Sequence, residues 1–273
     1  MTLLQRARGH FGLAVRAVGP RTRRADLEQG GCCRLLFPRV AGDSLEAVTV
    51  NISGGIAAGD RIEGRIECGP GTDLLVTSQA AERIYRARSD DPAAEMEISC
   101  QLAEGARLEW LPHGTIYFDG SRMRRHVNVA MAASSTFLFL ETRIFGRIAS
   151  GETVERLDIR DRLSVRRAGV LLLEDMVRLE SYDVAALLNR KAVAAGQVVN
   201  ATLVLIAPDA EARLVAVRAL LEEIHEGSFA ASAWNGMLVV RAIAPGSWPL
   251  DMAMRRILPV LRDDRPMPAT WRS

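Results

Sequence analysis

The sequence has 273 residues, of which 48% are apolar and 25% charged, a balance typical of a globular protein with a substantial core. The formal net charge is only +2 and no dense block of Lys or Arg occurs, which argues against a nucleic-acid-binding protein. No run of about 18 apolar residues predicts a transmembrane helix, and the N-terminus lacks the pattern of a secretory signal.

Cysteine usage predicts a reducing compartment. Four cysteines in a chain of this length are too few for a disulfide framework. They are Cys32, Cys33, Cys68 and Cys100. We therefore expect a cytoplasmic protein with reduced thiols.

Short apolar segments, often alternating with polar residues, predict β-strands up to about residue 205. In chain order they cover 47–52, 73–79, 107–112, 126–131, 136–145, 169–179 and 198–206. Gly, Asp, Ser or Pro separates most of them, and no long helical pattern intervenes. These features predict a mainly β body over about residues 10–205.

Three of the predicted strands resemble one another. Each begins with a small residue, at Gly71, Gly105 or Ser135, and has apolar residues three and five positions later. The starts are 34 and 30 residues apart. Such a repeat is compatible with stacked β-layers that wind on one another, although coincidence among strand–turn–strand units explains it equally well.

The C-terminal part, about 206–273, predicts two α-helices with a strand at 236–244 between them. Apolar residues at 214, 217, 220, 221 and 224 form one helical face, with Asp209 as the expected N-cap and Gly227 as the expected stop. Ser247 is the expected N-cap of the second helix, and Pro259 should kink or end it. No composition shift marks a linker, so residues 1–273 are interpreted as one domain.

The loop NISGGIAAGDR at 51–61 has the G-x-x-x-x-G spacing of a phosphate-binding P-loop, at Gly54 and Gly59. That motif continues with Lys and then Ser or Thr, where this chain has Asp60 and Arg61. A carboxylate would repel phosphate, and Arg cannot ligate magnesium. The loop is therefore interpreted as a Gly-rich structural turn.

Metal ligands are sparse in the sequence. The four histidines lie in different segments, and the adjacent Cys32 and Cys33 have poor geometry for binding one tetrahedral ion. His113 lies in an apparent turn and could meet His126 across a hairpin, so these two residues are the candidates for a transient metal contact. No G-x-S-x-G sequence predicts a nucleophilic serine.

Acidic and polar residues near the strands leave two alternatives open. Two-carboxylate hydrolysis could use Asp60, Glu109, Asp119 or Glu141, although such acids are more often solvated or paired with Arg. Thr77 and Gln79 share a strand face after an apolar run. They predict either a buried hydrogen-bond network or a water-filled polar passage.

Four motifs, in order and spacing, resemble the UreD/UreH family of urease accessory proteins. The first two fall on Asn51, Ser53, Gly54, Gly55, Gly59 and Asp60, and on Thr77, Gln79, Ala80, Ala81 and Tyr85. The other two fall on Leu111, Pro112, Phe118, Asp119 and Gly120, and on Gly146, Arg147, Gly151 and Glu152. The sequence departs from the family pattern at Ile52, Ala58 and His113-Gly114, which leaves open any role of the usual Glu at position 114.

The resemblance implies a mainly β fold of stacked, helically wound sheets with two C-terminal α-helices and no enzymatic activity. It implies a scaffold that binds the accessory protein UreF, through it the GTPase UreG, and the urease apoprotein, in a hetero-oligomer. Nickel would be transient cargo in an internal passage, with no tightly bound cofactor.

The resemblance also directs attention to particular residues. The C-terminal helices and tail are the expected partner surface. The polar residues proposed for the passage or an interface are Asp60, Thr77, Gln79, Tyr85, Asp119 and Glu141. Two alternatives are a carboxylate-dependent hydrolase on a β-solenoid body and a nickel-storage protein.

Overall fold

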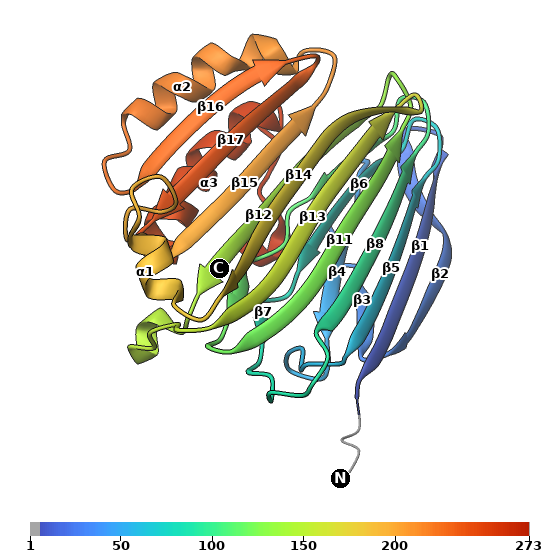
Figure 1. The fold of residues 1–273 in the computed structure, drawn as a ribbon. Coiled ribbons are helices and arrows are strands. Elements are labelled where there is room, and N and C mark those ends of the chain that lie inside the picture. The colour runs from blue at the N-terminus through green and yellow to red at the C-terminus, as the bar shows by residue number, and fades with distance from the viewer. Residues whose placement is uncertain (1–5, 273) are drawn as a thin grey trace.

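Two β-sheets face each other in the computed structural model, which describes residues 6–272 (Figure 1). The seven-stranded sheet contains, in spatial order, β14 (Val170–Ser181), β13 (Leu157–Arg167), β11 (Ser121–Met131), β8 (Ala94–Leu102), β5 (Arg61–Cys68), β1 (Arg8–Val18) and β2 (Arg21–Gly31).

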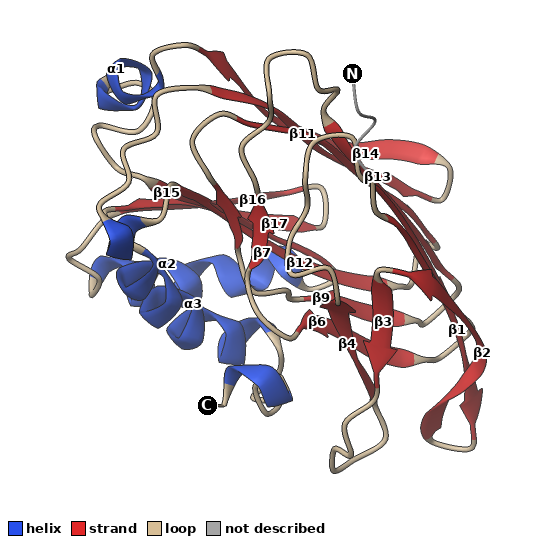
Figure 2. Ribbon diagram, turned by 90° about the horizontal axis from the view of Figure 1, so that it is seen from below, coloured by secondary structure: helices blue, strands red, loops and turns tan. Residues whose placement is uncertain are grey.

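The ten-stranded sheet lies between the seven-stranded sheet and the C-terminal helices (Figure 2). Its main path is β16 (Ser228–Trp234), β17 (Met237–Ala244), β15 (Val199–Ile206), β12 (Thr136–Phe145), β9 (Arg107–Trp110), β6 (Asp73–Ser78), β4 (Leu45–Asn51) and β3 (Cys33–Leu36). Two short strands, β10 (Thr115–Tyr117) and β7 (Glu82–Ile84), continue outward from β12.

Burial follows the alternation of the strands. In β5 every second residue is buried, because one face of the seven-stranded sheet meets the core and the other meets solvent. The ten-stranded sheet is covered on both faces: Leu74 packs between the sheets, whereas the neighbouring Leu75 packs toward the helices. Two apolar cores therefore share this sheet.

Apart from the three-residue strands β7 and β10, successive strands from β4 to β13 alternate between the sheets. Neighbours within each sheet along this segment pair in parallel. Leu74 pairs with Leu108, which confirms the 34-residue spacing of the first two repeat copies. The third copy was aligned one residue off, since Leu108 pairs with Phe137. Leu138 faces the helices instead, because a slip of one residue turns a strand side chain to the other face.

The prediction of a mainly β protein is confirmed, and every predicted strand has an observed counterpart. The structure shows two open facing sheets and does not confirm the solenoid-like description. The predicted β body also contains an unexpected helix, α1 (Val184–Asn189), whose first turn is capped by the Asp183 carboxylate. Its six residues are too short to give a helical periodicity in the sequence.

The two C-terminal helices are confirmed as α2 (Leu214–Glu222) and α3 (Ser247–Leu261), but their expected ends are wrong. The Asp209 carboxylate binds Arg213 rather than capping a helix, and Gly227 lies beyond the end of α2. Gly246 occupies the N-cap position expected for Ser247. Pro259 lies in the last turn of α3, where its missing N–H does not end the helix at once.

Both C-terminal helices are shorter than a bilayer crossing requires. No helix within residues 6–272 has the length and apolar character to span a membrane.

Candidate functional site

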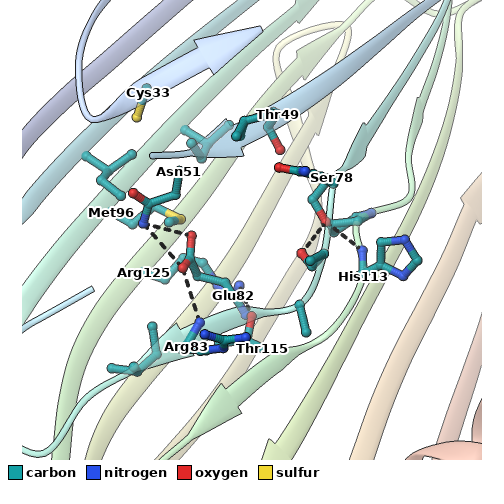
Figure 3. Close-up of a pocket in the computed structure, with 18 of the residues that line it drawn as sticks. Cys33, Thr49, Asn51, Ser78, Glu82, Arg83, Met96, His113, Thr115 and Arg125 are labelled. Atoms are coloured by element: carbon teal, nitrogen blue, oxygen red, sulfur yellow. Dashed lines mark hydrogen bonds between the residues drawn. The ribbon is translucent and has the colours of Figure 1, made fainter. Parts of the chain in front are cut away.

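A cavity of about 230 Å³ lies between the two sheets (Figure 3). Its apolar side is formed mainly by the seven-stranded sheet, through Phe11, Ile62, Met96, Ile98, Met123 and Val127. Its polar side is formed by Asn51, Ser78, Gln79, Glu82, His113 and Arg125. We call this space the inter-sheet cavity.

Glu82 is the carboxylate at the polar side of the inter-sheet cavity. The Asn51 amide donates to both of its oxygens, at 3.3 and 3.2 Å, and the Arg83 N–H donates at 3.1 Å. Burial raises the pKa of Glu82. The two sets of hydrogen bonds and the positive charge of the more distant Arg125 lower it, but they offset the effect of burial only in part. Glu82 is thus a partly desolvated acid held by neutral donors.

A buried cluster of charges adjoins the inter-sheet cavity. Arg125 contacts Glu141 at 2.7 Å and donates to Asp161 at 2.8 Å, and Arg143 donates to Asp161 at 2.5 Å. Burial alone would favour neutral acids, and it raises the pKa of Glu141. In Asp161 the two guanidinium groups outweigh burial and hold its pKa well below the usual value.

The charge cluster continues to the opposite side of the molecule. Arg143 donates to Asn200 at 3.1 Å, and Arg241 donates both to Thr202 at 2.8 Å and to Asp175 at 3.0 Å. The Arg241 side chain is 45% exposed, so the polar contacts reach solvent there. Arg143 also donates to the same Thr202 hydroxyl at 3.5 Å. Arg125 and Glu141 line the inter-sheet cavity together with Glu82. We call the contacts that run from Arg125 and Glu141 through Asp161 and Arg143 to Arg241 and Asp175 the polar chain.

The four sequence motifs meet at one corner of the molecule, which we call the motif corner. The Tyr85 hydroxyl donates to the Gly54 carbonyl at 2.7 Å, and its ring meets Phe118 edge-on at 5.3 Å. The Arg147 guanidinium lies 4.7 Å from the centre of the Phe118 ring, and Glu152 binds Arg147. The motifs thus build one continuous structure from distant segments.

Two predicted polar residues, Asp60 and Asp119, have structural roles in these turns. Asp60 accepts from the N–H groups of Ala7 and Ala57, at 2.7 and 2.8 Å, and so ties the Gly-rich loop to the start of β1. This supports the interpretation of the loop as a structural turn. Asp119 accepts from the backbone N–H of Glu155, at 2.8 Å.

The other predicted polar residues separate into different places. Thr77 is buried on the helix side of the ten-stranded sheet, where it donates to Leu111 O at 2.8 Å and meets Thr270 at 3.2 Å. Of the two alternatives for Thr77 and Gln79, these contacts favour the buried hydrogen-bond network for Thr77. Gln79 is exposed at the rim of the inter-sheet cavity, and Glu141 lies within the buried charge cluster.

His113 and His126, the candidates for a transient metal contact, lie in different places and have different partners. His113 stacks on Trp271, with ring centres 5.4 Å apart, and burial lowers its pKa. His126 lies on β11 in the other sheet, 3.1 Å from Ser164 and 3.6 Å from Glu97. Within residues 6–272 no three His, Cys, Asp or Glu side chains are grouped to hold a metal ion.

The acids considered for hydrolysis are held at separate places by other partners. Asp60 and Asp119 accept from backbone N–H groups, Glu109 binds Arg262, and Glu141 binds Arg125. The structure does not assemble these four residues into a carboxylate pair facing one cleft.

The inward-facing charges at Glu82, Arg125, Arg143 and Asp161 were missed in the sequence. A usable signal was present in the alternation of the strands. Glu141 and Arg143 occupy the same face of β12 as Phe137 and Phe139, so they interrupt an apolar face. A charge at such a position must find a buried partner.

Gly55 is expected to be intolerant of a side chain. Its φ is +150°, and an added β-carbon would lie 2.5 Å from the Tyr85 ring. Gly55→Ala should destabilise the protein by about 3 kcal/mol through strain and overpacking. Gly54→Ala is the control: its φ is +78°, its added β-carbon meets open space, and we expect only about 1–2 kcal/mol. Equal shifts in the urea midpoint would contradict the proposed packing of Tyr85.

Asp119 is expected to contribute to acid unfolding. Burial opposes its ionisation, but the N–H groups of Arg156 and Glu155 and the Arg86 guanidinium outweigh burial and lower its pKa. Its stabilisation is therefore present above its unfolded pKa and is lost as the pH falls through its folded pKa. Asp119→Asn should flatten the loss of stability between about pH 5 and pH 3. Urea midpoints at both pH values test this, with the exposed Asp90→Asn as control; parallel curves would refute the role.

Comparison with known proteins adds to this geometry. The family model described as UreD urease accessory protein matches residues 7–272. The chain is 43% identical to a urease accessory protein UreD from Methylobacterium sp. (strain 4-46), over 98% of this chain and 96% of that protein. It is 42% identical to the protein of that name from Rhizobium leguminosarum bv. trifolii, over 98% and 96%. The urease accessory protein UreD from Xanthobacter autotrophicus is 41% identical to the chain, over 98% of this chain and 91% of that protein.

Proposed function

The chain belongs to the UreD family of urease accessory proteins, and on this basis we propose that it is a non-enzymatic scaffold that helps deliver nickel to the urease apoprotein. In this proposal it acts in the cytoplasm within a hetero-oligomer. It binds UreF, which brings the GTPase UreG, and it carries nickel as transient cargo without a resident cofactor.

The observation that supports a conduit is the polar chain between the two sheets. Charged groups in an otherwise apolar core are costly unless they are paired, and here they connect the inter-sheet cavity to solvent near Arg241. Glu82 is the proposed receiving position because its partners are neutral donors that an incoming cation can displace. Farther along, nickel would have to displace Arg125 from Glu141, so that ion pair would control onward passage.

The proposed partner surface is the outer side of the C-terminal helices. Three large apolar side chains are exposed there: Val215 on α2, and Trp248 and Met252 on α3. Exposed apolar groups of this size are typical of surfaces that bind other proteins.

The function is tested by reconstituting urease in a heterologous host. Urease apoprotein, UreF and UreG would be expressed with and without this chain, and nickel per active site and urease activity would be measured. We expect loading only when the chain is present and co-elutes with UreF. Equal loading without it would refute the proposal. Tight binding of several nickel ions without activation would favour storage, and ester or glycan turnover by the chain alone would favour a hydrolase.

Glu82→Gln tests the proposed receiving position. The substitution keeps the shape and removes the charge, so we expect nickel loading at limiting nickel to fall severalfold while the complex with UreF still forms. Glu95→Gln on β8 is the matched control, because Glu95 is an exposed acid paired with Arg61. If nickel loading of urease is unchanged in Glu82→Gln, Glu82 is not on the nickel path, and the proposed scaffold role is unaffected.

A further inference from the structure

Cys32 and Cys33 direct both sulfur atoms to one point. Adjacent residues of a regular strand face opposite sides, which is why the pair looked unsuited to a common ligand. In the structure, a β-carbon added to Gly9 would lie 2.5 Å from Cys33 Sγ and 2.6 Å from Cys32 Sγ. The two sulfurs are therefore no more than 5.1 Å apart.

The convergence follows from a tight corner between the sheets. β2 ends in the seven-stranded sheet at Gly31, and β3 starts in the ten-stranded sheet at Cys33, with Cys32 in the turn. Gly31 has φ +59°, and a β-carbon there would lie 1.7 Å from Arg8 O. The Cys32 N–H donates to Arg8 O at 3.3 Å and its carbonyl accepts from Ile52 N–H at 2.9 Å, so the turn is held on both sides.

Cys33 connects the thiol pair to the inter-sheet cavity, and Cys32 lies outside the residues that line it. Cys33 lines the cavity, as Figure 3 shows, and both cysteines are buried and unoxidised. Burial, followed by the Cys32 thiol, raises the pKa of Cys33 to about 12, so this thiol is protonated at neutral pH. A protonated thiol alkylates slowly. The protonated thiol can still lose its proton as its sulfur forms a bond to an element that has a high affinity for sulfur.

We propose that Cys32 and Cys33 form a vicinal dithiol site that binds trivalent arsenicals of the form R–As(OH)₂ entering through the inter-sheet cavity. Two As–O and two S–H bonds break, two As–S bonds form, and two water molecules leave with the thiol protons. Arsenic stays trivalent, so the step needs no oxidant or reductant.

The chemistry of the surroundings favours an arsenical over a metal cation. A trivalent arsenical needs two sulfurs, its third position being taken by its organic group, and it enters as a neutral molecule. That group would lie against the apolar side of the cavity, near Phe11 and Ile62. A zinc or nickel ion would need more ligands, and no set of three suitable side chains is grouped anywhere in residues 6–272.

The test uses phenylarsine oxide and the full-length chain. Intact-mass spectrometry should show one phenylarsenic group per chain, and peptide mapping should place it on Cys32 and Cys33. Cys32→Ser and Cys33→Ser should each weaken binding about 100-fold, because the second bond is no longer intramolecular. Cys68→Ser is the matched control, since Cys68 is buried on β5, and it should bind as the unmodified chain does.

A displacement experiment on the unmodified chain keeps the proposal testable if a variant does not fold. At equal thiol concentration, 2,3-dimercaptopropanol should remove the arsenical and 2-mercaptoethanol should not. The proposal is overturned if both remove it equally, if the adduct maps to Cys68 or Cys100, if a single-serine variant binds as tightly as the parent, or if no adduct forms.

Discussion

Asp161→Asn is expected to destabilise the protein by about 3–5 kcal/mol, the cost of breaking a buried ion pair. The substitution keeps the side-chain shape but leaves Arg125 and Arg143 buried, with Glu141 as the remaining acid in the cluster. The Asp161 side chain is only 5% exposed, so water cannot replace the lost charge. A loss of this size is a large part of the stability of a typical domain.

The matched control for Asp161 lies three residues away on the same strand. Asp158 pairs with Arg124 at 2.6 Å, and both side chains are about one third exposed. Asp158→Asn should cost less than about 1 kcal/mol, because solvent screens such pairs. Urea unfolding followed by tryptophan fluorescence measures both variants. Similar midpoints for the two would show that the buried cluster does not stabilise the fold.

Arg262→Met is the second large expected effect, at about 3 kcal/mol. Arg262 is 2% exposed, and it donates to Glu109 at 2.7 Å and to Pro266 O at 2.8 Å. Its loss leaves Glu109 buried with Arg107 as its remaining cationic partner among the described residues. The chain after α3 should loosen as well, because Arg262 joins that segment to β9.

Hydrogen exchange over 263–272, together with the urea midpoint, tests the role of Arg262. Arg256→Met on the same helix is the control, since Arg256 pairs with Glu223 and both are largely exposed. The double variant Glu109→Leu with Arg262→Met should recover part of the stability, because apolar pairs often replace buried ion pairs at little cost. No protection change in Arg262→Met would contradict the proposed anchoring of the tail.

Docking of the C-terminal tail depends on contacts that only the folded chain makes. Ala269 N–H donates to Glu46 at 2.7 Å, and the Trp271 indole donates to Leu111 O at 3.2 Å. Glu46 is buried, which raises its pKa. These contacts place Trp271 in the core beneath the helices.

Local features of the sequence were sufficient for much of the fold. The alternation of apolar and polar residues within single strands predicted the mainly β class. This alternation is visible in the sequence because successive side chains of a strand point to opposite faces. Asp60 in place of Lys was enough to reject a P-loop, and the structure shows that carboxylate accepting backbone N–H groups. The start of α2 was missed because the Asp209 carboxylate binds Arg213, four residues further on, and so does not cap the helix.

The sequence by itself therefore determined the mainly β class, part of the strands and the presence of the two C-terminal helices. Only the tertiary structure decided which side chains share the space between the sheets. Paired strands here are 29 or 34 residues apart, as for Leu108 with Phe137 and Leu74 with Leu108. Because a slip of one residue reverses every side chain, the register of the ten-stranded sheet sends Thr77 toward the tail. The tight corner between the two sheets turns Cys32 and Cys33 to one point.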